Sequence, residues 1–110
     1  MRKHTILDNE EDFDNWMAKI LATRKDFETG YMEAILEDYK EFRDTRPVIS
    51  ALKQIAIAKG MSKVAKDAVL PRVTLSRALS AKGNPRMDTL FSIIDALGLE
   101  ISVRAKGSPA

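Results

Sequence analysis

Apolar residues recur at intervals of three and four along most of this chain, with polar and charged residues between them. That period is typical of amphipathic helices, which bury one face against the rest of a fold. The pattern therefore predicts a mainly helical protein. The predicted helices cover residues 10–23, 25–42, 47–59, 62–68, 72–79 and 87–97.

The two N-terminal helices each carry an apolar stripe that includes aromatic side chains. The stripes consist of Phe13, Trp16, Met17, Ile20 and Leu21 in the first helix, and of Phe27, Tyr31, Ile35, Tyr39 and Phe42 in the second. Aromatic residues at helical spacing are more often part of a core than of a contact surface. We therefore expect both stripes to pack against the remainder of the chain.

Capping and helix-breaking residues support the predicted helix limits. Asp8 or Asn9 precedes the first helix as an N-cap, and Pro47 suits a first turn because its missing N–H would be unpaired there. Gly60 and Gly98 follow apolar helical patterns and are expected to end the third and last helices. These residues therefore mark the start of the first helix, both ends of the third and the end of the last.

A different pattern follows the last helix. Leu99, Ile101 and Val103 alternate with polar residues, which is the period of a half-buried strand. A lone strand is not stable, and no other strand-like segment is evident in the chain. We therefore expect these three residues to pair with the same strand of a second copy, or with a sheet edge on another protein.

The charge is unevenly distributed, although the net charge is only +2 over 110 residues. Residues 1–50 hold 8 Lys/Arg and 12 Asp/Glu, whereas residues 51–110 hold 10 Lys/Arg and 4 Asp/Glu. A basic half suits a phosphate backbone and an acidic half suits a basic protein surface, although uneven solvated charge alone also explains the difference. The sequence has no membrane-spanning run, no signal-peptide pattern and no cysteine, so we expect a cytoplasmic protein without disulfides or thiolate-bound zinc.

The region between Gly60 and Gly98 has the layout of a helix-turn-helix, whose second helix enters the DNA major groove. In the helix over 72–79, Leu75 and Ala78 or Leu79 are predicted to point inward. The outward residues are then Arg72, Val73, Ser76 and Arg77, with Thr74 at the boundary. Arginine reads guanine through two acceptors and valine contacts a thymine methyl, so this face is the predicted base-reading surface.

Polar and basic residues flank that helix on both sides. Phosphate contacts usually come from such flanking positions and set the register of the protein on DNA. The candidates are Ser62, Lys63, Lys66, Lys82, Asn84 and Arg86. Each alone is more often solvated surface, and together on one basic motif they favour DNA as a partner.

At this point the chain resembles the addiction-module antidote family, the HigA-like antitoxins with an Xre-type helix-turn-helix. The resemblance rests on residues 60–68 (GMSKVAKDA), 75–90 (LSRALSAKGNPRMDTL) and 95–99 (DALGL), and more loosely on 13–17 and 31–38. Two positions depart from the usual motif. The turn has Val69 where glycine is usual, so it is strained or takes another form, and the second helix starts after Pro71, which has no capping side chain.

The resemblance implies that residues 46–104 include an all-α, lambda-repressor-like helix-turn-helix domain. The sequence pattern adds an N-terminal acidic helical region (1–45), partner-binding or accessory, a short C-terminal β-strand and a disordered tail (105–110). The resemblance also implies an antitoxin that binds its own operator as a dimer and neutralises a basic RelE/ParE-superfamily (HigB-like) toxin. Trp16, Tyr31 or Tyr39 would suit a toxin contact, although packing in the core is the favoured interpretation of these aromatics.

Other function classes remain as alternatives. An enzyme is disfavoured because the sole histidine, His4, has no plausible partner, and the acidic cluster over 8–14 lacks the glycine and terminal glutamate of a calcium loop. We therefore expect no catalysis, cofactor or metal. A stand-alone helix-turn-helix regulator without a toxin stays open, as does a protein-binding module whose DNA readout has degenerated at Val69 and Pro71.

Overall fold

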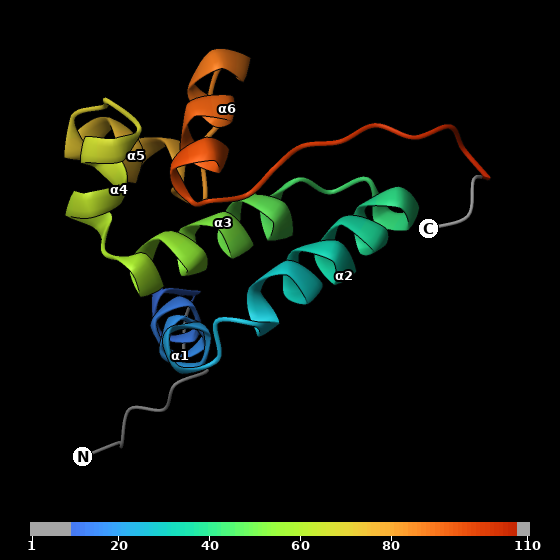
Figure 1. Cartoon of the computed structure of the whole chain (residues 1–110), viewed down its shortest axis with the longest axis horizontal. Helices are drawn as coiled ribbons and strands as arrows, with labels where there is room; N and C mark the ends of the chain where they lie inside the picture. The colour runs from blue at the N-terminus through green and yellow to red at the C-terminus, as the bar shows by residue number, and fades with distance from the viewer. Residues whose placement is uncertain (1–9, 108–110) are drawn as a thin grey trace.

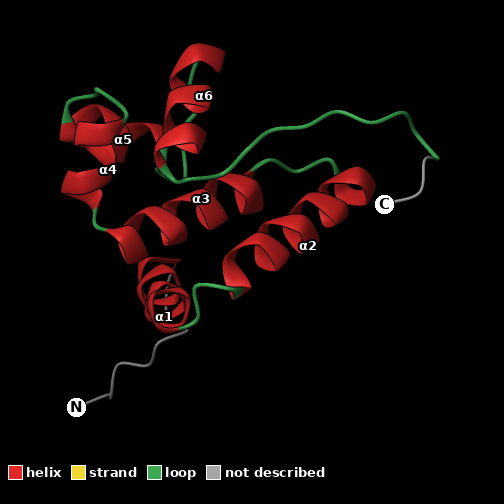
Figure 2. Ribbon diagram, in the orientation of Figure 1, coloured by secondary structure: helices red, strands yellow, loops and turns green. Residues whose placement is uncertain are grey.

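The computed structural model describes residues 10–107, and every regular element in this part of the chain is a helix (Figures 1 and 2). The all-helical prediction is confirmed, and the predicted helix limits agree with the observed ones to within two residues. The elements are α1 (Glu10–Thr23), α2 (Phe27–Phe42), α3 (Arg46–Lys59), α4 (Met61–Asp67), α5 (Arg72–Ala78) and α6 (Met87–Ala96). The predicted caps Asp8 and Asn9, the residue His4 and the tail residues 108–110 lie outside the described residues.

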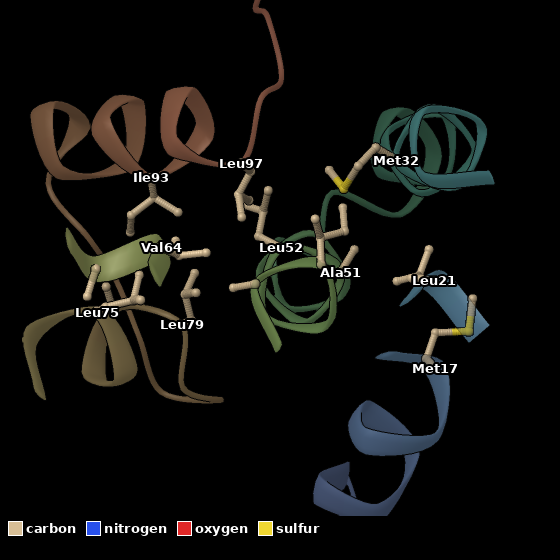
Figure 3. Close-up of a cluster of buried hydrophobic side chains, with 14 residues drawn as sticks. Met17, Leu21, Met32, Ala51, Leu52, Val64, Leu75, Leu79, Ile93 and Leu97 are labelled. Atoms are coloured by element: carbon tan, nitrogen blue, oxygen red, sulfur yellow. The ribbon is translucent and has the colours of Figure 1, made fainter. Parts of the chain in front are cut away.

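Helix α3 is the centre of the fold. It contacts α1, α2 and α4, while α4 in turn contacts α5 and α6. Figure 3 shows Met17, Leu21 and Met32 on one side of α3, and Val64, Leu75, Leu79 and Ile93 on the other. These side chains and Ala51 and Leu52 of α3 belong to one cluster of buried apolar residues. The N-terminal and C-terminal helices therefore share a core through α3.

Helix α3 ends at Lys59, directly before Gly60, as predicted from the sequence. Gly60 has φ of +101°, and its N–H donates to the carbonyls of Ala56 at 2.9 Å and Ile57 at 3.1 Å. Because a side chain is rarely tolerated at positive φ, glycine suits this junction between α3 and α4. The sharp change of direction here separates the N-terminal helices from the two short helices that follow (Figure 1).

A buried polar chain joins the three N-terminal helices. Gln54 of α3 is 1% exposed, and its Nε2 donates to Oδ1 of Asp14 in α1 at 2.7 Å. The hydroxyl of Tyr31 in α2 donates to Oε1 of the same glutamine at 2.5 Å. Lys53 Nζ lies 3.5 Å from the second oxygen of Asp14. Buried polar groups are costly unless paired, so these bonds fix the positions of α1 and α2 on α3.

The turn between α2 and α3 is also fixed by a charged pair. The Asp44 carboxylate accepts hydrogen bonds from the guanidinium and the backbone N–H of Arg46. The side-chain bond, followed by the backbone bond, lowers the pKa of the Asp44 carboxyl to about 2. Asp44 therefore stays ionised across the physiological range, and the turn keeps this contact.

The predicted C-terminal strand is not found among the described residues. Residues 99–105 form a loop that runs away from α6 (Figure 2). Leu99 packs against the edge of the core, but Ile101 is 54% exposed and Val103 is 94% exposed. The physical reason is that a strand needs a neighbouring strand to pair with, and the described part of this chain offers none.

Candidate nucleic-acid interface

Helices α4 and α5 are two short helices joined by a turn over residues 68–71. The N–H of Leu70 donates to the carbonyl of Ala65 at 2.9 Å, and the N–H of Val69 donates to that of Lys66 at 3.1 Å. This pair of bonds is the Schellman arrangement that ends many helices. Val69 occupies its left-handed position with φ of +56°, although glycine is the usual residue there. The turn thus keeps the glycine geometry with a strained valine.

Pro71 starts α5 in an extended conformation, with φ of −58° and ψ of +143°. Its carbonyl accepts hydrogen bonds from the N–H groups of Thr74 at 3.0 Å and Leu75 at 3.1 Å. No side chain caps the helix, in agreement with the sequence. Proline instead favours the start of α5 by restricting φ to a value that this turn already requires.

The orientation of α5 is the one that the sequence predicts. Leu75, Ala78 and the following Leu79 are buried in the core. The outward side carries Arg72, Val73, Ser76 and Arg77, all exposed, and Thr74 is half-buried at the boundary. Helix α5 therefore presents two arginines, a serine and a valine from one helix face.

Two of the exposed cations of α4 and α5 are held by neighbouring side chains. Arg72 Nη1 donates to the Ser62 hydroxyl at 2.9 Å, and Lys63 Nζ lies 2.9 Å from Asp67 Oδ2, one turn along α4. The Ser62 contact was not anticipated from sequence, because a separation of ten residues across a turn leaves no local signal. Lys66, Arg77 and Lys82 form no ion pair with any other described residue, so their charges remain available to an anionic partner.

The loop between α5 and α6 comes close to the end of α5. The Gly83 N–H donates to the Ser80 carbonyl at 2.8 Å, and a Cβ at residue 83 would lie 2.2 Å from the Ala78 carbonyl oxygen. Only glycine fits so close an approach. The loop leaves Lys82 and Asn84 exposed, and Arg86 Nε lies 3.6 Å from the Asp88 carboxylate. Close packing against the Ala78 carbonyl therefore explains the glycine of the KGNP sequence.

The electrostatic character of this region follows from its composition. Residues 60–86 contain six Lys/Arg and one Asp/Glu. All of these cations are exposed. An exposed basic surface with two arginines on one helix has a chemistry that suits duplex DNA.

The aromatic residues considered for a protein contact differ in their surroundings. Trp16 is 37% exposed and lies against Phe13, with ring centroids 5.7 Å apart. Tyr31 is half-buried and bonded to Gln54; burial and, secondarily, the charge of Asp14 raise its pKa. Tyr39 is half-buried, with the Arg43 guanidinium 5.5 Å from its ring centre. The Tyr31 hydroxyl is thus used in a hydrogen bond within the fold, whereas Trp16 and Tyr39 remain partly accessible.

The described residues show no group of acidic, histidine or cysteine side chains placed to hold a metal ion. None of their helices is long and apolar enough to cross a membrane.

A family model described as "Probable addiction module antidote protein" matches residues 9–105. An uncharacterized protein of Haemophilus influenzae is 35% identical over 94 residues, which cover 86% of this chain and 90% of that protein. No solved structure gives a significant match.

Proposed function

This chain belongs to the family of probable addiction module antidote proteins, and on that premise we propose that it is the antitoxin of a type II toxin–antitoxin module. An antidote implies a toxin that it neutralises. The resemblance noted in the sequence points to a RelE/ParE-superfamily, HigB-like toxin. The protein would act by binding rather than by catalysis, in the cytoplasm where such a toxin works.

We further propose that α4 and α5 form a helix-turn-helix of the lambda-repressor type that binds the operator of its own module. The observation that supports this most directly is the exposed face of α5, with Arg72, Ser76 and Arg77 outward over a buried Leu75. In this arrangement α5 lies in the major groove. Phosphates are bound by the flanking Lys63, Lys66, Lys82, Asn84 and Arg86. The Ser62 hydroxyl, which accepts a hydrogen bond from Arg72, acts through that arginine.

Dimerisation is the third part of the proposal. Ile101 and Val103 are exposed and lack a strand partner within the described chain, so pairing with the same segment of a second copy would bury both. In this account residues 46–104 are the DNA-binding and dimerising unit and residues 1–45 the partner-binding region. A truncation after Gly98 that stays dimeric in analytical sedimentation would contradict the dimer contact.

The operator proposal is tested by titrating the purified protein against the promoter upstream of its own gene and against a scrambled duplex. At about 150 mM salt, nonspecific phosphate contacts are weakened. We expect submicromolar promoter binding, about a hundredfold or more tighter than to scrambled DNA. Equal or absent binding would contradict operator recognition and would favour a protein-binding module whose DNA readout has degenerated.

A further inference from the structure

The apolar stripe of α2 extends beyond the core that α2 covers. Met32 is the only buried residue of this helix. Further along, Leu36 is 45% exposed, Tyr39 is half-buried and Phe42 is 69% exposed. A spacing of three residues places these side chains along one side of the helix. We call Leu36, Tyr39 and Phe42 the α2 patch.

The packing of α2 explains why the patch is uncovered. Among the helices, α2 packs against α3, through Tyr31, Met32 and Ile35 near its first half. Its C-terminal half lies at the end of the molecule away from α4 and α5 (Figure 1). Single exposed apolar residues are common on protein surfaces, but a row of large ones on one helix face is typical of a contact surface.

The charge around the patch selects the kind of partner. Glu33 and Asp38 lie one helical turn from Leu36 and Phe42 respectively, and neither forms an ion pair with another described residue. Residues 26–44 contain seven Asp/Glu and two Lys/Arg, Lys40 and Arg43. Such a surface repels nucleic acid and anionic lipid and attracts a basic protein.

A second copy of this chain fits the patch less well. A symmetric dimer formed through it would place Glu33 and Asp38 of one copy against the same acidic region of the other. Like charges at a contact disfavour association. The acidic border therefore favours a partner of opposite charge over self-association.

The position of the patch fits a protein that has two partners at once. The longest dimension of the molecule is 54 Å, and α4 and α5 lie at one end of it while the C-terminal half of α2 lies at the other (Figure 1). A protein bound to the α2 patch would leave the exposed face of α5 accessible. The acidic surface is also far from the proposed DNA contact, where it would otherwise weaken phosphate binding.

We infer that the α2 patch, with Glu33 and Asp38 at its border, is the docking surface for a basic protein, and that this protein is the toxin. The identification of the partner as the toxin rests on the proposed antitoxin function. Phe42 and Leu36 supply the apolar contact, while the two carboxylates attract and orient the basic surface.

The test uses the full-length protein and the purified product of the reading frame beside its gene. Leu36→Ser/Phe42→Ser removes the apolar contact at two exposed positions. The matched control is Phe91→Ser, because Phe91 of α6 is also exposed, at 49%. Affinity for the neighbouring protein is measured by calorimetry, and promoter binding and thermal stability are measured on the same samples.

We expect the double variant to bind the neighbouring protein about thirtyfold more weakly, while Phe91→Ser binds like the wild type. Promoter affinity and thermal stability should be unchanged in both. The charge variant Glu33→Lys/Asp38→Lys should also bind more weakly, and the wild-type affinity should fall as salt is raised.

Three results would overturn the inference, and they are distinguishable. If the double variant binds the neighbouring protein as tightly as the wild type, the toxin docks elsewhere and the antitoxin function stands. If the double variant converts a dimer into a monomer in sedimentation, the patch is a self-association surface. If the wild type itself does not bind the neighbouring protein, the proposed antitoxin function fails together with the docking surface.

Discussion

Arg72 Nη1 donates a hydrogen bond of 2.9 Å to the Ser62 hydroxyl, which joins the first residue of α5 to the second residue of α4. This bond restrains the guanidinium before any partner binds. Holding a long side chain in place in advance reduces the entropy lost on binding. In the proposed complex, Arg72 would reach a base edge or a phosphate from this restrained position.

Removing the Ser62 hydroxyl should therefore weaken operator binding through Arg72. We expect Ser62→Ala to cost about 0.5–1.5 kcal/mol, the cost of ordering one flexible side chain, and Arg72→Ala to cost about 1–3 kcal/mol. The double variant should lose little more than Arg72→Ala alone, because the serine acts through the arginine. Losses that simply add in a titration of all three variants would contradict this coupling.

Arg77 and Lys82 are expected to play different roles on DNA. Arg77→Ala should lower operator affinity by about 1–3 kcal/mol and relax the preference at one base pair, because an arginine can read guanine. Lys82→Ala should weaken binding to every duplex alike and reduce the salt dependence of log affinity by about one unit. Equal losses on operator and random DNA for Arg77→Ala would exclude its role in base reading.

The left-handed valine offers a test of backbone strain. Val69 and Gly98 have the same role, since each follows a helix with positive φ and Schellman-type hydrogen bonds. Val69 is 87% exposed, so Val69→Gly removes strain and little packing. We expect it to raise the free energy of unfolding by about 1 kcal/mol, and Gly98→Val to lower it by about 1–2 kcal/mol. Thermal denaturation that shows a less stable Val69→Gly protein would contradict the assigned strain.

Tyr31 should make the stability of the fold depend on alkaline pH. Burial, then the charge of Asp14, raise its pKa above the ordinary 10.0, so the folded state favours the neutral hydroxyl. The raised pKa means that Tyr31 contributes to the free energy of unfolding. This stabilisation is fully present below about pH 10 and is lost as pH rises through the raised folded-state pKa. Tyr31→Phe should lower the free energy of unfolding by about 1 kcal/mol at neutral pH, because Gln54 Oε1 loses its hydrogen-bond donor. At high pH the stability of this variant should decline less steeply than that of the wild type. If the unfolding free energies of the wild type and Tyr31→Phe, measured by urea denaturation, fell in parallel with pH, the proposed role of Tyr31 would be contradicted.

The helices could be predicted from sequence because their signals are local. The apolar period, together with Pro47, Gly60 and Gly98, defines the helix limits without reference to the rest of the chain. The outward face of α5 was predictable for the same reason, since Leu75 identifies the buried side. Local pattern was therefore sufficient for the elements and for the candidate DNA surface.

Relationships between distant residues could not be predicted in this way. Nothing in the sequence around Gln54 indicates that it bonds to Asp14 and Tyr31 on two other helices. The stripe of α2 suggested full burial, whereas the core ends before Phe42 and leaves it exposed. The strand predicted over 99–103 is not found in the described part of the single chain, because alternation indicates a half-buried segment but does not supply its partner.

Growth of cells that express the two neighbouring genes tests the antitoxin function. The reading frame beside the gene is expressed alone and then together with this protein, in cells that carry neither gene. We predict that the neighbouring product alone arrests growth and that coexpression of this protein restores it. A neighbouring product that arrests growth equally with and without this protein, or that has no effect on growth by itself, would contradict the account.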